Sequence, residues 1–165
     1  MKQKILYLMS GPPGCGKSTW IERQLWQGGG TWISRDKIRF GMLKEGEDYF
    51  AHEDEVFDKF IADIQCAIND DSLGTNIYVD ATHLNKTARD KVLKQLDLSE
   101  VDEINCVFFK VDSEICIGRN EQRTGLARVP RSVIRRMWFS HIMPDADENF
   151  DKIIVIDNEG NEVIK

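Results

Sequence analysis

The sequence predicts an α/β fold in which a five-stranded parallel sheet is covered by helices on both faces. Short β-type runs alternate with helical patterns along the chain, which is typical of βαβ units. Most of these β-type runs are continuously apolar, as expected for strands buried on both faces of a sheet. With 165 residues, of which 41% are hydrophobic and 30% charged, the chain can form one sizeable core. We therefore expect a single domain over residues 1–165.

The strands and helices follow one another in a regular order. Five apolar or β-branched runs are expected to form the strands, at residues 4–9, 31–34, 76–80, 104–111 and 152–157. Residues 19–26 are expected to form the first helix, and residues 28–30, all glycine, only connect it to the second strand. The later helices are predicted from apolar residues at helical spacing, namely Val56, Phe57, Phe60, Ile61, Ile64 and Ile68, then Val92, Leu93 and Leu96, then Ile115, Cys116 and Ile117, and finally Val133, Ile134, Met137 and Trp138 after Pro130.

The segment after the first strand carries the clearest chemical signal. Its sequence matches the phosphate-binding loop pattern, with glycines that let backbone N–H groups turn inward around phosphates, and it indicates a nucleoside triphosphate. Lys17 is expected to reach the outer phosphates, while the Ser18 hydroxyl is expected to bind Mg²⁺. The residues expected to contact the nucleotide here are Gly11, Pro12, Pro13, Gly14, Cys15, Gly16, Lys17, Ser18 and Thr19.

Polar residues follow the second strand, at the edge of a parallel sheet where ligands usually bind. Asp36 and Arg39 lie three residues apart and would share one face of a short helix that also carries Arg35. One interpretation is a capped helix start with a local ion pair between Asp36 and Arg39. The other is a general base that takes a proton from an attacking hydroxyl, beside an arginine that holds an anionic group of the acceptor.

The third strand also ends in a polar segment. Asp80 could hold Mg²⁺ through water, as a second acidic partner of the phosphate-binding loop, or could cap the next turn. Thr82 follows in the same segment, and we leave both interpretations of Asp80 open. Four aromatic side chains lie near these segments and could either stack on a base or pack in the core, namely Trp32, Phe40, Tyr49 and Phe50.

Arginine is concentrated late in the chain. Six of the ten arginines lie within one 18-residue stretch, namely Arg119, Arg123, Arg128, Arg131, Arg135 and Arg136. This stretch is predicted to form a lid at about residues 119–141, whose arginines would neutralise charge on a transferred phosphoryl group. The alternative is a solvated basic surface. The apolar residues Met137, Trp138, Phe139 and Met143 exceed what one buried face needs, so self-association is possible while the oligomeric state is open.

Together these motifs resemble the polynucleotide 5′-hydroxyl kinase family, a bacteriophage-type group of P-loop phosphotransferases related to AAA-like predicted kinases. The matching segments are residues 35–39 (Arg-Asp-Lys-Ile-Arg), residues 80–82 (Asp-Ala-Thr), and two arginines four apart before Val129-Pro130. The resemblance implies a P-loop kinase fold with an arginine-bearing lid. It implies that Asp36 is the general base, Arg39 the contact to the acceptor phosphate and Arg123 the lid arginine, while Lys17 and Ser18 contact the donor.

By this resemblance the protein transfers the γ-phosphate of ATP, with Mg²⁺, to the 5′-hydroxyl end of single-stranded RNA or DNA. The phosphate-binding loop is also compatible with a kinase of nucleosides, sugars or sugar-nucleotides of the zeta-toxin type, or with a non-catalytic nucleotide switch. A net charge of −6 and a pI of about 5.1 argue against a protein that coats nucleic acid non-specifically. Four cysteines without metal-type spacing, and no long apolar span, suggest a cytoplasmic protein without a membrane partner.

Overall fold

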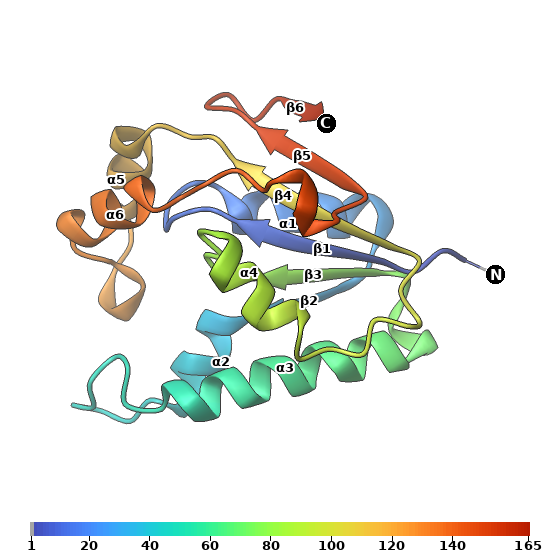
Figure 1. The fold of residues 1–165 in the computed structure, drawn as a ribbon. Helices are drawn as coiled ribbons and strands as arrows, with labels where there is room; N and C mark the ends of the chain where they lie inside the picture. The colour runs from blue at the N-terminus through green and yellow to red at the C-terminus, as the bar shows by residue number, and fades with distance from the viewer. Residues whose placement is uncertain (1) are drawn as a thin grey trace.

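The computed structural model describes residues 2–165, which form one six-stranded sheet with helices on both faces (Figure 1). The sheet order is β2-β3-β1-β4-β5-β6. The strands are β1 (Ile5–Ser10), β2 (Thr31–Ser34), β3 (Asn76–Asp80), β4 (Glu103–Phe109), β5 (Lys152–Ile156) and β6 (Glu162–Ile164). The α-helices are α1 (Lys17–Gly28), α2 (Arg35–Met42), α3 (Glu53–Asn69), α4 (Lys86–Leu93), α5 (Ser113–Glu121) and α6 (Arg131–Phe139). Short 3₁₀ turns lie at η1 (Asp71–Leu73), η2 (Gly125–Ala127) and η3 (Ala146–Glu148).

The α/β class predicted from the sequence is confirmed, but the strand count and the purely parallel sheet were wrong. The five predicted strands are present and parallel to their neighbours. A sixth strand, β6, pairs with β5 in the antiparallel direction, with Val155 opposite Val163. Its three residues are all exposed, so β6 carries neither the length nor the buried apolar run on which the prediction depended.

Several element boundaries also differ from the sequence prediction. The first helix begins at Lys17 rather than at residue 19, because its first turn is formed by the end of the phosphate-binding loop, and it includes Gly28. Helix α4 ends at Leu93, so Leu96 lies beyond it although it packs against the same core. Strand β4 ends at Phe109, which leaves Val111 outside the sheet. Helix ends depend on local hydrogen bonds that apolar spacing does not record.

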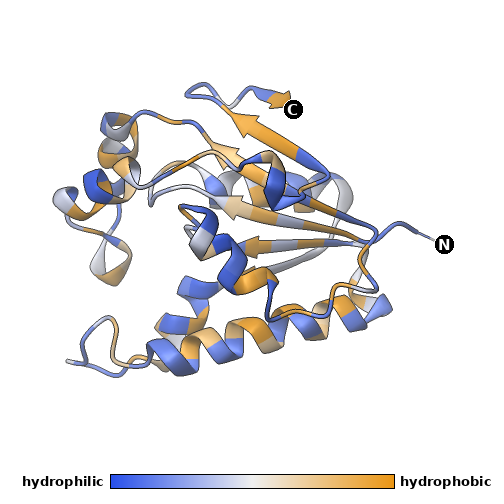
Figure 2. Ribbon diagram, viewed as in Figure 1, coloured by the Kyte–Doolittle hydropathy of each residue, from blue (hydrophilic) through white to orange (hydrophobic). Residues whose placement is uncertain are grey.

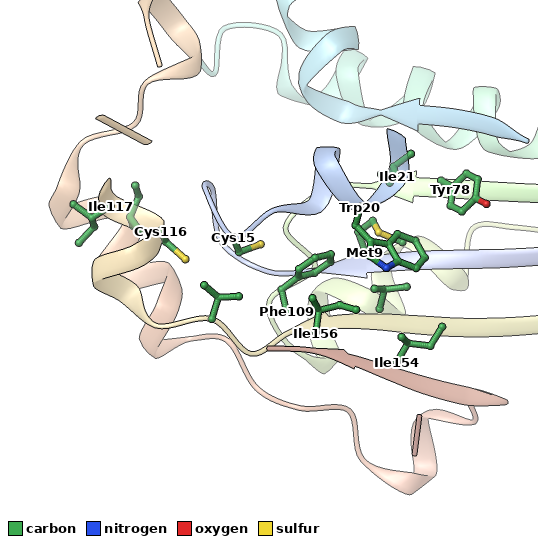
Figure 3. Packing of buried hydrophobic residues seen from close by; sticks show 13 residues of the cluster. Met9, Cys15, Trp20, Ile21, Tyr78, Phe109, Cys116, Ile117, Ile154 and Ile156 are labelled. Carbon is green, nitrogen blue, oxygen red and sulfur yellow. The ribbon is translucent and has the colours of Figure 1, made fainter. Parts of the chain in front are cut away.

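Alternating residues of each central strand face two separate apolar cores. In β1, Leu6 and Leu8 pack with α3 and α4, while Met9 packs with α1, α5 and α6. Figure 2 shows the strands mainly in hydrophobic colours, and α3 with hydrophobic and hydrophilic segments interleaved. Figure 3 shows the second core, in which Cys15 of the phosphate-binding loop lies between the sheet and Cys116 of α5. The loop is therefore anchored to both the sheet and α5.

The strand order places the loop after β1 at a reversal point of the sheet. From β1 the chain continues to β2 on one side, whereas from β3 it continues to β4 on the other side. Ligands of open α/β sheets bind in the crevice at such a point, beyond the carboxyl ends of the strands. Figure 1 shows α2, the α2–α3 connection, α5 and α6 gathered at that end of the sheet.

The rest of the described chain adds two negative findings. Within residues 2–165 no helix has both the length and the apolar character needed to cross a bilayer. All four cysteines in this range are free thiols, three of them buried, at positions 15, 106 and 116. Burial raises the pKa of Cys106 and of Cys116 to about 12, so both remain protonated at neutral pH.

Candidate active site

The phosphate-binding loop joins β1 to α1 through two left-handed glycines. Gly14 and Gly16 have φ angles of 83° and 106°, a region that side chains disfavour. A Cβ on Gly14 would also lie 2.3 Å from the carbonyl oxygen of Cys116, so only glycine fits between the loop and α5. The Lys17 ammonium donates to the carbonyls of Gly11 and Pro12, at 2.8 and 3.1 Å.

The amino end of α1 adds a second feature that suits an anion. Its N-cap is Gly16, which offers no side chain to the free N–H groups of the first turn, and that turn holds no acidic residue. Those N–H groups and the positive end of the helix dipole are therefore free to bind a negative ligand. Ser18 and Thr19 of this first turn are exposed.

A cavity of about 1150 Å³ opens above this loop. Its walls come from the loop and α1, from α2 and the α2–α3 connection, from the end of β3, and from α5, η2 and α6. Of the predicted site residues it is lined by Pro13, Gly14, Gly16, Lys17, Ser18, Thr19, Arg35, Asp36, Arg39, Asp80, Thr82, Arg119 and Arg123. Gly11, Pro12 and Cys15 do not line it. Gly11 and Cys15 instead lie against each other within the loop.

The acidic residue after β2 lies in a network of polar groups. The Asp36 carboxylate, whose side chain is 60% exposed, forms an ion pair with Arg39 and accepts a 3.0 Å hydrogen bond from the Tyr49 hydroxyl. Arg39 is buried, and its guanidinium also contacts Glu53 at 2.7 Å and donates to Tyr49 at 3.0 Å. Burial and the Asp36 charge raise the pKa of Tyr49 to about 12, so its hydroxyl stays a donor.

Glu53, at the start of α3, was not predicted from the sequence. It accepts hydrogen bonds from Arg35 at 3.1 Å and from Arg39 at 2.7 Å, and so holds both arginines of α2. These two arginines keep the pKa of Glu53 below its ordinary value despite the opposing effect of partial burial. Since Glu53 lies 14 residues from Arg39, only the packing of α2 on α3 brings them together.

The carboxylate at the end of β3 is buried beside the loop. Asp80 is only 8% exposed and accepts a 3.0 Å hydrogen bond from the indole N–H of Trp32. Burial raises the pKa of Asp80, while the Lys17 charge and the Trp32 hydrogen bond oppose that shift. The Lys37 ammonium lies 3.5 Å from the Trp32 ring centroid, so one face of the indole also forms a cation–π contact. Thr82 follows, and its carbonyl accepts from the Gly11 N–H at 2.8 Å.

The arginine-rich segment forms the opposite wall. Arg119 donates to the loop carbonyls of Gly14 and Cys15, at 3.4 and 3.2 Å. Arg123 and Arg128 line the cavity, and neither forms an ion pair with a carboxylate in residues 2–165. In contrast, Arg131 and Arg135 pair with glutamates of α5 and do not line the cavity. The predicted basic surface is thus divided between arginines that face the cavity and arginines that stabilise α5 against α6.

A buried amide, which was not predicted from the sequence, joins the two ends of this segment. Asn120 is 1% exposed, and its amide donates to the carbonyl of Val129 at 2.6 Å while accepting from the N–H of Val129 at 2.9 Å. This pair of bonds joins the end of α5 to the segment that precedes α6 and leaves residues 122–128 as a connection between them. Asparagine placed between arginines gives no local signal for this role.

The cavity is basic although the chain is acidic. Its lining includes seven basic side chains against three acidic ones, namely Lys17, Arg35, Lys37, Arg39, Arg119, Arg123 and Arg128 against Asp36, Glu53 and Asp80. Positive charge concentrated in a cleft attracts phosphate-bearing ligands. Among residues 2–165 no group of three His, Cys, Asp or Glu side chains could hold a metal ion.

Two oxygen groups beside the loop nevertheless fit Mg²⁺. The Ser18 hydroxyl lies exposed on the cavity wall, and one carboxylate oxygen of Asp80 is not used by Trp32. Mg²⁺ commonly binds one or two protein oxygens together with substrate phosphates and water. Ser18 and Asp80 are therefore the residues that would hold it here, directly or through water.

A second cavity of about 380 Å³ adjoins the first. Gly16, Thr19 and Arg119 line both cavities, so the Arg119 side chain lies at their boundary. The outer wall of the smaller cavity is the β5–β6 turn, where the Asp157 carboxylate accepts N–H bonds from Glu159 and Asn161. The three histidines line neither cavity, and His83 is buried.

Comparison with known proteins identifies a family over most of the chain. The family described as AAA domain matches residues 6–142. The Arabidopsis thaliana protein named Transcription factor bHLH140 is 26% identical over an alignment 162 residues long, and the match covers 92% of this chain. This chain spans only 16% of that relative's length.

Solved structures share the fold at low sequence identity. A sugar kinase from Janibacter sp. HTCC2649 has a TM-score of 0.64 at 18% identity, covering 97% of this chain and 88% of its own. The structure titled Pnkp1/Rnl/Hen1 RNA repair complex has a TM-score of 0.70 at 20% identity, covering 85% of this chain and 44% of its own. A fungal RNA kinase has a TM-score of 0.58 at 18% identity, covering 95% and 75%. The fold is therefore that of P-loop kinase structures.

Proposed function

We propose that this chain, which belongs to the AAA domain family, is an ATP-dependent kinase of polynucleotide 5′-hydroxyl ends. The observation that carries the proposal is that the phosphate-binding loop and Asp36 line one basic cavity. Phosphoryl transfer needs a bound triphosphate and a base at the attacking hydroxyl within one such space. The RNA repair complex and the fungal RNA kinase named above support a polynucleotide as acceptor.

In this proposal the donor occupies the loop side of the cavity. The triphosphate lies against the N–H groups of the loop and the first turn of α1, and Lys17 exchanges its loop carbonyls for phosphate oxygens. Mg²⁺, when bound, neutralises the outer phosphates. The smaller cavity beyond Arg119 has space for the nucleobase, because it continues from the loop on the side away from Asp36.

The acceptor occupies the α2 side. Asp36 is exposed enough to accept the proton of a 5′-hydroxyl, and Arg39 with Tyr49 fixes the orientation of its carboxylate. Every nitrogen of the Arg39 guanidinium contacts Asp36, Glu53 or Tyr49, so in this state Arg39 orients the proposed base. The contact between Arg39 and an acceptor phosphate stays a prediction, and it requires Arg39 to give up one of these partners.

The lid segment completes the proposed site. Arg123 faces the cavity without a carboxylate partner in the described chain, so its charge is available for the transferred phosphoryl group. An arginine that stabilises this charge contributes about 10³- to 10⁵-fold to the rate in other phosphoryl transfer enzymes. Asn120 fixes the base of the segment, and in this proposal residues 122–128 close over the bound substrate.

A second candidate is a small-molecule kinase. The Janibacter sugar kinase structure covers 97% of this chain and 88% of its own, so the shared fold extends over nearly both lengths. Such an enzyme would use the same donor site with a different acceptor. A third candidate is a nucleotide-binding switch, which would bind the nucleotide without transferring a phosphoryl group to any acceptor.

The test is transfer of label from γ-labelled ATP, with Mg²⁺, to a 5′-hydroxyl oligonucleotide. Lys17→Ala should abolish labelling, and Lys110→Ala, an exposed lysine outside both cavities, should leave it unchanged. Labelled oligonucleotide supports the proposal. Label found only on nucleosides or sugars in a parallel panel supports the second candidate, and ATP binding without any transfer supports the switch.

A further inference from the structure

Three aromatic side chains form a row along the α2 side of the cavity. We call Phe40, Tyr49 and Phe50 the aromatic row. The ring centroids of Phe40 and Tyr49 are 6.2 Å apart and those of Tyr49 and Phe50 are 4.8 Å apart, both edge to face. All three line the cavity. Because the Tyr49 hydroxyl donates to Asp36, the row extends from the proposed base toward the solvent.

Phe50 is the most exposed aromatic ring of this wall. The Trp32 ring is covered by Lys37, and the Tyr49 ring is covered by Arg39 at 4.6 Å. Phe40 is partly buried. Phe50 is 61% exposed, and its one aromatic contact is the edge-to-face contact with Tyr49. Phe50 lines the cavity and is mostly exposed, so its ring is accessible to a planar ligand bound there.

The loop that carries Phe50 is ordered by its own hydrogen bonds. The Asp48 carboxylate accepts from the Phe50 N–H at 2.9 Å, which forms an Asx turn. Glu47 accepts from the Lys44 N–H and contacts the His52 ring, both at 2.8 Å. These bonds order the backbone that carries the ring, in the α2–α3 connection, which Figure 1 shows below α5 and α6 at the same end of the sheet. An ordered backbone lowers the entropy lost when a planar ligand stacks on the ring.

We propose that Phe50 is a stacking surface for the base of the acceptor's 5′-terminal nucleotide. This inference rests on the proposed function and deepens it. Tyr49 contacts both Asp36 and Phe50, so the proposed base and the exposed ring lie on either side of one side chain along the cavity wall. Arg128, an exposed cation of the opposite wall, is placed to attract the strand's phosphates. Stacking on an aromatic ring tolerates every base, so it selects polynucleotides without selecting a sequence.

The test compares kinetic constants for two acceptors that differ by one base. One is a 5′-hydroxyl oligonucleotide, and the other carries an abasic residue at its 5′ terminus. Phe50→Ala should raise KM for the intact oligonucleotide roughly 5- to 100-fold, with kcat little changed, because alanine substitution of a stacking aromatic has this range of effect. Phe50→Trp should restore the wild-type KM. With the abasic acceptor, wild type and Phe50→Ala should have the same, raised KM.

Trp26→Ala is the matched control, since Trp26 is an aromatic residue of α1 that is 92% exposed and lines neither cavity. It should leave both KM values unchanged. Equal effects of Phe50→Ala on the intact and the abasic acceptor would overturn the stacking proposal while leaving the proposed function standing, and so would no effect on either. If the wild-type protein labels no oligonucleotide, the proposed function is overturned and the stacking proposal fails with it.

Discussion

The orientation of the Asp36 carboxylate depends on a network of contacts, part of which comes from residues distant in the sequence. Its carboxylate is exposed to the cavity, but its orientation is fixed by buried Arg39 and by the Tyr49 hydroxyl. Arg39 is in turn fixed by Glu53 from the next helix. A base held in one orientation by charged partners needs little reorganisation when a hydroxyl approaches, which favours catalysis by positioning.

Asp36→Asn should therefore abolish transfer while ATP binding stays nearly unchanged. The amide keeps the size of the carboxylate but cannot accept the proton, and the donor contacts lie in the phosphate-binding loop. A loss of about 10²- to 10⁴-fold in kcat is expected. Labelling kinetics and equilibrium ATP binding are the two measurements. Full turnover of the variant with an oligonucleotide would show that Asp36 is not the general base.

Glu53→Gln should destabilise the protein by about 1–3 kcal/mol, measured as the free energy of unfolding in urea. The amide leaves the buried Arg39 guanidinium without its charged partner on α3. Asp58→Asn removes a charge from an exposed position of the same helix and should change stability by less than about 0.5 kcal/mol. Equal effects of the two substitutions would mean that Glu53 is only a surface charge.

At the scale of elements, the loop after β1 and helix α5 fit together as one unit. Cys116 of α5 approaches Gly14 so closely that no side chain fits, and Cys15 packs between α5 and the sheet. Arg119 of the same helix donates to two loop carbonyls. The segment proposed as a lid therefore begins in a helix that contacts the loop directly.

Gly14→Ala should disrupt this unit, with a loss of stability of at least about 2 kcal/mol and a loss of ATP binding. The positive φ angle strains any side chain, and the clash involves backbone atoms of Cys116, which cannot move alone. Gly41→Ala, in α2 with no atom near the added Cβ, should be neutral or slightly stabilising. Thermal unfolding and nucleotide binding of both variants check the prediction. Wild-type binding by Gly14→Ala would contradict it.

At the scale of the whole molecule, a buried histidine, His83, and a half-buried one, His141, connect distant segments of the chain. His83 contacts the Met9 carbonyl through Nδ1 at 2.7 Å, and His141 contacts the Ser10 hydroxyl at 3.1 Å and stacks on Phe108. Burial lowers the pKa of His83 to about 3 and that of His141 to about 4. Both histidines are therefore still neutral in the folded protein near pH 6.5, where they become protonated in the unfolded chain.

Stability should consequently fall as the pH is lowered from 7 toward 5. Below pH 6.5 the unfolded chain binds protons at both histidines while the folded chain does not. Their contribution to the free energy of unfolding is therefore present above pH 6.5 and is lost as the pH falls toward their pKa values in the folded protein. His52, whose pKa is raised by Glu47, acts in the opposite direction. Urea denaturation at several pH values measures the slope.

His141→Phe is the informative variant for this slope. It keeps a ring against Phe108 but cannot titrate, so its stability should depend less on pH between 7 and 5 than that of the wild type. His52→Gln removes the opposing group and should make the dependence steeper. If His141→Phe retained the full wild-type slope, His141 would not be a source of the acid sensitivity.

The sequence alone determined the α/β class, the five parallel strands and the place of the phosphate-binding loop after the first of them. These follow from local patterns, because a buried strand must be apolar and a phosphate loop must carry glycines at fixed positions. The ion pair of Asp36 and Arg39 was equally local, since residues three apart share a helix face. The roles assigned to these residues remain predictions.

Only the tertiary structure decided which distant groups meet. Glu53 reaches Arg39 because α3 packs on α2, and Trp32 reaches Asp80 because β2 pairs with β3. The structure also separated the aromatic residues near the site, since Trp32 and Tyr49 each carry a cation on one face while Phe50 is 61% exposed. Strand β6 was missed because three exposed residues hold no apolar pattern and form a strand only against β5. Long-range pairing depends on the whole chain being folded, so no local pattern encodes it.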